Sequence, residues 1–163
     1  MDKNEFLVVK KMILRNIIFL VLNFSALYLG VILANEGGSS DWYSNLTKAP
    51  WEPDGWVFGA AWTSIMICFS VYMSINWNRT INKKKLLIFY LLQYVLNVFW
   101  NPIFFGFHYI LFGFIIILML TFLIGYLFFY YRSNTNYYSI LILPYFFWLI
   151  IATSLNGYIF IYN

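Results

Sequence analysis

Hydrophobic positions in this chain are gathered into long runs that charged residues separate. Charge-free runs cover residues 16–35, 55–78, 86–131 and 133–163, with lengths of 20, 24, 46 and 31 residues. A helix needs about 20 apolar residues to cross the hydrocarbon core of a bilayer. The run of 46 residues is long enough for two such helices, and Gly106 and His108 interrupt it. The pattern therefore predicts five transmembrane helices, over residues 17–35, 56–77, 86–105, 109–131 and 138–160.

Two alternatives to five helical spans are weaker. A transmembrane barrel needs strands of about 10 residues with alternating polarity, whereas residues 111–118 are apolar on every side. The first run has a basic flank that would suit a signal peptide, but its apolar part is long and residues 32–34 form a poor cleavage site. We therefore expect a single all-α integral membrane domain over residues 1–163, a five-helix bundle with an uncleaved first span.

Composition agrees with a membrane protein and excludes other classes. Hydrophobic residues make up 63% of the chain, charged residues 10%, and the mean hydropathy is +0.74. A soluble domain has about 25% charged residues, and a disordered chain needs low hydrophobicity. A net charge of +4 without a basic face speaks against nucleic-acid binding. The single Cys68 excludes an intrachain disulfide and a cysteine zinc site.

The Lys and Arg residues predict the orientation in the membrane. Nine of the ten basic residues fall on one side of the predicted spans, in residues 3–15, in residues 79–85 and at Arg132, and only Lys48 falls on the other side. Basic loops stay on the cytoplasmic side. We expect the N-terminus inside, the C-terminus outside, and a bacterial cell membrane as the location.

The connection between the first two spans, residues 36–55, is unusually long for a loop. Ser40 or Asp41 is suited to cap a short helix inside it. Trp42, Tyr43 and Trp51 are too apolar for a solvated linker. They would either anchor the loop in lipid headgroups or cover a cavity. We call residues 36–55 the lid loop.

Polar residues inside the spans point to a binding cavity in the outer half of the bundle. The spans contain no Asp, Glu, Lys or Arg, which argues against a proton-coupled pump or an ion channel. Gln93, Asn97 and Asn101 recur every four residues, so they either hydrogen-bond between helices or line a cavity. An aromatic and polar set falls in the outer half, near the lid loop: Trp62, Asn97, Trp100, Trp148, Ala152 and Asn156. Such a set suits a flat hydrophobic ligand held by stacking and shape.

A stripe of small residues and the single histidine have structural explanations. Ala26, Gly30 and Ala34 favour close helix packing, within one chain or in a dimer. His108 is favoured as an interfacial turn residue over a haem ligand. The sequence shows no metal cluster and no catalytic Ser/His/Asp set.

Three separated segments resemble the TspO/MBR family, the tryptophan-rich sensory proteins also described as translocator proteins or peripheral-type benzodiazepine receptors. They are residues 51–62 (WEPDGWVFGAAW), residues 93–106 with QYVLNVFW and FFG, and residues 144–156 with PYFFW and ATSLN. The lid loop adds a Trp42-Tyr43-x-x-Leu46-x-Lys48 pattern. The resemblance runs in order over about residues 20–160.

The resemblance implies a five-helix fold, often dimeric, with a lidded pocket and no required cofactor. It implies binding of tetrapyrroles such as protoporphyrin IX or haem, and of isoquinoline- or benzodiazepine-type ligands, in a sensor or stress-response role. Trp62 and Trp148 match tryptophans implicated in light-dependent oxidative degradation of protoporphyrin, which is the alternative function, with tetrapyrrole transport as a further one. The matching ligand-binding positions are Phe58, Gly59, Trp62, Asn97, Trp100, Trp148, Ala152, Leu155 and Asn156, with Trp42, Tyr43 and Trp51 in the lid.

The chain departs from the family pattern at two positions of the second span. Ala60 stands where the family has a proline, which puts the usual kink in question. Met66 stands where a tyrosine is expected, so a pocket hydroxyl should be missing. Residues 158–163 carry no Lys or Arg, so the sterol-recognition motif is absent.

Overall fold

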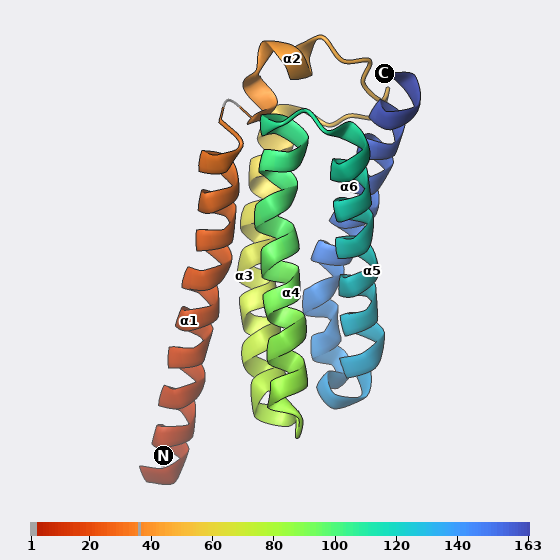
Figure 1. Cartoon of the computed structure of the whole chain (residues 1–163). Coiled ribbons are helices and arrows are strands. Elements are labelled where there is room, and N and C mark those ends of the chain that lie inside the picture. Colours follow the sequence, from red (N-terminus) through yellow and green to blue (C-terminus); the bar gives the residue numbers. More distant parts are fainter. Residues whose placement is uncertain (1–2, 36) are drawn as a thin grey trace.

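The computed structural model describes residues 3–35 and 37–163, and this part of the chain is a bundle of long helices without a strand. The helices run up and down between the two ends of the molecule (Figure 1), with the N- and C-termini at opposite ends. Five long helices make up the bundle: α1 (Lys3–Leu33), α3 (Gly55–Arg79), α4 (Lys83–Asn101), α5 (Ile110–Thr135) and α6 (Leu143–Tyr162). The expected all-α five-helix bundle is confirmed.

Four apolar helical stretches of the described residues are long enough to cross a membrane: Leu7–Ser39, Gly55–Arg79, Lys83–Gly106 and Ile110–Tyr162. The last stretch has 53 residues, which would be roughly 80 Å as one straight helix. A hydrocarbon core is only about 30 Å thick. This stretch is instead folded back on itself, because the 3-10 turn η3 (Asn136–Ile142) joins α5 to an antiparallel α6 (Figure 1). Length and fold together give five crossings in a multi-pass membrane protein.

The helix ends differ from the prediction in informative ways. The expected break near Gly106 is confirmed, since a π-helical turn, η2 (Pro102–Gly106), follows α4 and His108 has a φ of 59°. α6 begins at residue 143 rather than 138, because Asn136 leaves the helical region with a φ of 51°. Pro144 then lies in the first turn of α6, where its missing N–H costs no hydrogen bond. α1 begins well before residue 17, so the basic N-terminal flank is helical too.

The helices form a ring in the order α1, α3, α6, α5 and α4, as their contacts show. Ala26, Gly30 and Ala34 are buried inside this ring. A Cβ added at Gly30 would lie 2.6 Å from Nδ2 of Asn101. The small-residue stripe of α1 therefore serves close packing within one chain.

Aromatic and amide side chains fill the core. Tyr72, Tyr90 and Tyr145 are almost fully buried. Asn23 of α1 accepts a hydrogen bond from the Tyr90 hydroxyl at 2.9 Å and donates one to the Met66 carbonyl at 3.2 Å. This one amide therefore ties α1 to both α3 and α4, as expected for a polar group in a membrane bundle.

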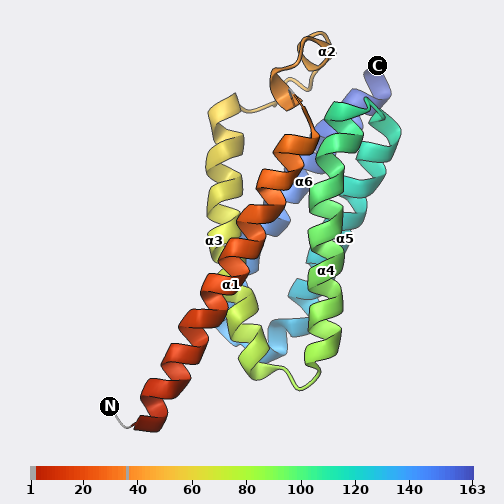
Figure 2. The same cartoon turned by 60° about the vertical axis from the view of Figure 1, so that its left-hand side comes forward.

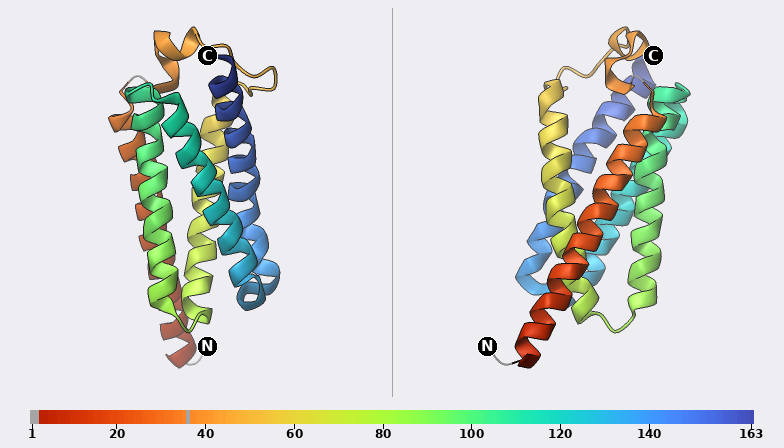
Figure 3. Two further views of the ribbon diagram at one scale, coloured as in Figure 1. Left: turned by 45° about the vertical axis from the view of Figure 1, so that its right-hand side comes forward. Right: turned by 90° about the vertical axis from the view of Figure 1, so that its left-hand side faces the viewer.

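The lid loop lies across the end of the bundle where α6 ends (Figures 2 and 3). It contains the short helices η1 (Gly37–Ser39) and α2 (Asp41–Ser44). Of the two expected caps, Ser40 caps α2, because its hydroxyl accepts from the Tyr43 backbone N–H at 3.2 Å. Glu36, the first residue of the lid loop, lies outside the described residues.

Candidate functional site: an aromatic cavity beneath the lid loop

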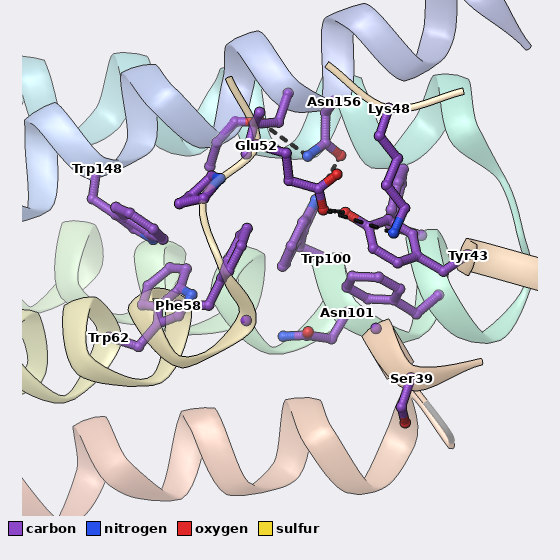
Figure 4. A pocket seen from close by; sticks show the side chains of 17 residues that line it. Ser39, Tyr43, Lys48, Glu52, Phe58, Trp62, Trp100, Asn101, Trp148 and Asn156 are labelled. Carbon is purple, nitrogen blue, oxygen red and sulfur yellow. Dashed lines mark hydrogen bonds and ion pairs between the residues drawn. The ribbon is translucent and has the colours of Figure 1, made fainter. Parts of the chain in front are cut away.

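A cavity of about 650 Å³ lies between the lid loop and the ends of α3, α4 and α6. Figure 4 shows its side chains converging from these separate elements. We call it the lid cavity. Its lining residues are Gly38, Ser39, Tyr43, Lys48, Glu52, Pro53, Gly55, Phe58, Trp62, Trp100, Asn101, Phe104, Phe105, Trp148, Ala152, Leu155 and Asn156.

The structure brings most of the sequence-predicted site residues together here. From the ligand-binding set, the residues that line the cavity are Phe58, Trp62, Trp100, Trp148, Ala152, Leu155 and Asn156, and Tyr43 joins them from the lid. Gly59 lies on the exposed face of α3, where an added Cβ would meet no atom within 4 Å. Asn97 is buried behind the cavity wall, and Trp42 and Trp51 lie at the edges of the lid.

Trp100 and Asn156 form a fixed polar contact in the cavity wall. The Trp100 ring N–H donates to Oδ1 of Asn156 at 3.3 Å. The Asn156 amide in turn donates to the Ala152 carbonyl, one turn earlier in α6, at 3.0 Å. Because the polar groups of Trp100 and Asn156 are paired with each other and with the backbone, the wall that the Trp100 ring and Ala152 form is mostly apolar.

Trp148 presents an indole donor that has no partner. Its side chain is 8% exposed, and its ring lies edge-on to Phe58 with centroids 5.4 Å apart. Among the described residues, no acceptor lies within hydrogen-bonding distance of its Nε1. A buried N–H without a partner is costly, so an acceptor on a bound molecule would stabilise this wall.

Trp62 is held by a chain of polar residues deeper in the bundle. Its ring lies edge-on to Tyr145 with centroids 5.9 Å apart. The Tyr145 hydroxyl accepts from the Asn97 amide at 2.8 Å and donates to Oε1 of Gln93 at 3.2 Å. Asn97 therefore supports the cavity wall from behind rather than facing the cavity.

The lid loop is fastened to the bundle at both sides of the cavity. On one side, the Trp51 ring N–H donates to the Ser154 hydroxyl at 3.1 Å, and Thr47 exchanges two backbone-to-side-chain hydrogen bonds with Asn163. On the other side, the Trp42 ring stacks on the His108 ring with centroids 4.1 Å apart. His108 thus lies at a turn, as expected, and supports the lid.

Charged groups from the lid reach the cavity, although the spans predicted from the sequence carry none. Lys48 Nζ lies 4.0 Å from the Glu52 carboxylate and 4.2 Å from the centre of the Tyr43 ring. The Tyr43 hydroxyl donates to Glu52 at 2.7 Å. Burial, and then the hydrogen bond to the Glu52 carboxylate, raise the pKa of Tyr43 well above its usual range. The mouth of the cavity is therefore polar, while its deep wall is aromatic (Figure 4).

Several lining residues were not predicted from the sequence. Lys48 and Glu52 lie in the two lid-loop segments that resemble the family, but nothing in those segments indicated that their side chains reach the cavity. Asn101 belongs to the polar stripe of α4. The sequence did not decide whether this stripe forms hydrogen bonds between helices or lines a cavity. Phe104 and Phe105 lie in the π-helical turn, where a helical spacing does not predict which face they occupy.

The two departures in α3 have different consequences. α3 is one continuous helix across Ala60, so a helical break does not occur there. Met66 is 1% exposed and packs in the core. Met66 does not line the lid cavity, and the expected loss of a pocket hydroxyl at this position stays a prediction.

Comparison with known proteins agrees with the geometry. The profile of the TspO/MBR family matches residues 17–162. The chain belongs to this family. It is 29% identical over 153 residues to the tryptophan-rich protein TspO of Archaeoglobus fulgidus, covering 88% of this chain and 98% of the relative. It is 28% identical over 116 residues to the tryptophan-rich sensory protein of Cereibacter sphaeroides, covering 71% of this chain and 73% of the relative.

A third relative is the protein CrtK of Rhodobacter capsulatus, 26% identical over 118 residues and covering 71% of this chain and 74% of the relative. The family match covers α1 from residue 17 onward, the other four long helices and the lid loop. The lid cavity of this TspO/MBR protein is thus built entirely from the matched region. No three His, Cys, Asp or Glu side chains come together in the part of the chain that the structure describes.

Proposed function

We propose that this TspO/MBR protein is a membrane sensor that binds flat tetrapyrroles, such as protoporphyrin IX or haem, in the lid cavity. The supporting observation is one cavity in which Trp62, Trp100 and Trp148 converge beneath a fastened lid. A volume of about 650 Å³ is within the usual range of small-molecule pockets. Isoquinoline- and benzodiazepine-type molecules are further proposed ligands, since they too combine apolar aromatic rings with a hydrogen-bond acceptor.

The polarity of the cavity supports an amphipathic ligand. Aromatic rings stack well on a flat macrocycle, and the unpaired Trp148 donor would reach an acceptor on it. Lys48 and Glu52 at the mouth would meet the polar edge of the ligand. No cofactor is part of this proposal, because binding rests on the side chains of the chain itself. The name of the relative from Cereibacter sphaeroides also supports a sensory role.

Fluorescence titration of the purified full chain with protoporphyrin IX tests the proposal. We expect saturable quenching of tryptophan fluorescence, and at least a tenfold weaker affinity in Trp62→Phe and Trp148→Phe. Losing a stacked indole and its donor costs about 1.5–2 kcal/mol. Trp77→Phe is the matched control, because Trp77 packs on Phe19 away from the cavity. Equal affinity in all variants would exclude the lid cavity as the site.

Light-dependent oxidation of the bound porphyrin is the second candidate function. The observation that favours it is the position of Trp62 and Trp148 in the wall of one cavity, where both would contact the ligand. Molecular oxygen would be the oxidant. Illuminated and dark samples should then differ in their porphyrin spectra, and Trp148→Phe should slow the change. The same product forming equally fast with free tryptophan would exclude true catalysis.

The assembly and orientation of the protein also belong to the proposal. We propose that it forms a homodimer in the membrane, with the N-terminus inside and the lid cavity facing outward. Tetrapyrrole transport remains the weaker alternative, because the predicted spans contain no charged residue that could couple transport to an ion gradient. Porphyrin flux into protein-containing vesicles no faster than into empty vesicles would exclude it.

A further inference from the structure

A second cavity, of about 850 Å³, lies at the end of the bundle opposite the lid. It is formed by the end of α5, the turn η3 and the start of α6, and we call it the turn cavity. Its lining combines polar residues, among them Arg132, Ser133 and Asn136, with apolar residues such as Phe129 and Ile140. Such a lining suits a molecule with a polar head and a hydrocarbon tail.

Among the residues that the structure describes, Arg132 forms no ion pair with a carboxylate. From Gly55 to the C-terminus the sequence contains no Asp or Glu. The contact recorded for the Arg132 guanidinium is the Phe128 ring, at 6.0 Å. Among the described residues at this end, Arg79 is engaged differently, since it donates to the Thr135 carbonyl at 3.3 Å. The charge of Arg132 is therefore available to an anion from outside the chain.

The residues around the turn cavity are typical of the level where lipid headgroups meet hydrocarbon. The first turn of α4 carries Lys83, Lys84 and Lys85 at the same end of the bundle (Figure 1). Phe129 and Ile140 are 67% and 65% exposed in the isolated bundle, so lipid must cover them in a membrane. A basic group beside exposed apolar side chains is typical of the interfacial region.

We propose that the turn cavity binds an anionic phospholipid of the leaflet at the basic end. The lipid phosphate accepts from the Arg132 guanidinium, with the Ser133 hydroxyl and the Asn136 amide as neighbouring donors, and an acyl chain lies on Phe129 and Ile140. A zwitterionic lipid carries the same phosphate but adds a cation, for which this end offers no carboxylate on α3 to α6. The preference for an anionic lipid follows from that asymmetry. This site is separate from the lid cavity and independent of its ligand.

Lipid binding to the delipidated full chain in detergent tests the proposal, with native mass spectrometry counting bound lipids. Phosphatidylglycerol should bind more tightly than phosphatidylcholine. Arg132→Gln should weaken phosphatidylglycerol binding by roughly five- to tenfold, the loss expected for one charge-assisted phosphate contact. Lys83→Gln is the matched control, because it removes an exposed basic residue of the same end that does not line the cavity. It should leave the first bound lipid nearly unaffected.

Three results would overturn the proposal. They are equal binding of the two lipids, equal losses in Arg132→Gln and Lys83→Gln, and full displacement of the lipid by inorganic phosphate, which would indicate a free-anion site. Should Arg132→Gln fail to fold, a photoactivatable phosphatidylglycerol decides the matter on the wild-type chain. Crosslinks within residues 128–143 support the site, and crosslinks only elsewhere exclude it.

Discussion

Single polar side chains in this bundle act mainly by fixing aromatic rings. Asn97 and Gln93 both bind the Tyr145 hydroxyl, and the Tyr145 ring supports Trp62 in the cavity wall. A polar group inside a membrane protein is therefore not by itself evidence of ligand contact. Here the amides act one layer behind the surface that a ligand would meet.

Removing the Tyr145 hydroxyl should lower stability. Tyr145→Phe deprives both amides of a partner, and each such contact in a membrane bundle contributes about 0.6–1.7 kcal/mol. We expect a loss of about 1–2 kcal/mol, seen as a lower midpoint of thermal unfolding in detergent. Tyr28→Phe is the control, because Tyr28 is 67% exposed. Equal midpoints for the two variants would show that the buried hydroxyl contributes nothing measurable.

The ionisation of Tyr43 should report the closed lid. Burial and the Glu52 carboxylate raise its pKa, so the folded protein favours the neutral phenol. This contribution to stability is complete below the unfolded pKa of about 10 and is lost as the pH rises through the raised value. We expect a spectroscopic pH titration to show the same amount of phenolate near pH 10 in the wild type and in Tyr43→Phe, because Tyr43 is still neutral there. Glu52→Gln should lower the pKa of Tyr43, and ionisation at the ordinary pKa in wild type would mean an open, solvated lid.

At the scale of helices, close contacts decide where small residues are needed. A Cβ at Gly113 of α5 would lie 2.7 Å from Cδ2 and 2.9 Å from Cβ of Phe104, in the π-helical turn that lines the lid cavity. Gly59 of α3 has no neighbour within 4 Å of such a Cβ. The two glycines therefore make a matched pair.

Alanine should destabilise one helix contact and not the other. Gly113→Ala forces Phe104 to shift and should cost about 1–3 kcal/mol, as overpacking usually does. Gly59→Ala should be neutral or stabilise by up to about 1 kcal/mol, because alanine favours the helix. Thermal unfolding measures both variants. Porphyrin affinity should fall only in Gly113→Ala, and the reverse order would contradict the packing of α5 against the turn.

At the scale of the whole molecule, the two ends are chemically distinct. The lid end carries the aromatic cavity and the acidic side chains of Asp41, Glu52 and Asp54. The opposite end carries Arg79, Arg132 and the three lysines at the start of α4, Lys83 to Lys85. Because basic loops stay inside, the lid cavity should open toward the outer face.

Cysteine labelling of intact cells tests this orientation. In a Cys68→Ser background, Thr47→Cys in the lid should react with a membrane-impermeant maleimide. Asn82→Cys, in the loop between α3 and α4, should react only after the membrane is opened. Both positions are exposed, so access is decided by the side of the membrane. The opposite pattern would invert the proposed topology.

The sequence by itself determined the five spans, because a bilayer excludes charge from about 20 residues of each crossing helix. It also selected the tryptophans of α3, α4 and α6, since their motifs resemble those of the family. It did not determine the start of α6, where one left-handed residue and a 3-10 turn delay the helix. The hydropathy pattern of a sequence does not predict such a local change of backbone conformation.

Only the tertiary structure decided which polar side chains meet the cavity. Residues four apart on a helix drift by about 40°, so Asn97 binds Tyr145 while Asn101, one turn later, lines the cavity. Lys48 and Glu52 reach the same space only because the lid loop folds over the bundle and is fastened to α6. Helix rotation and the path of the lid are set by packing between distant segments, which no local pattern in the sequence encodes.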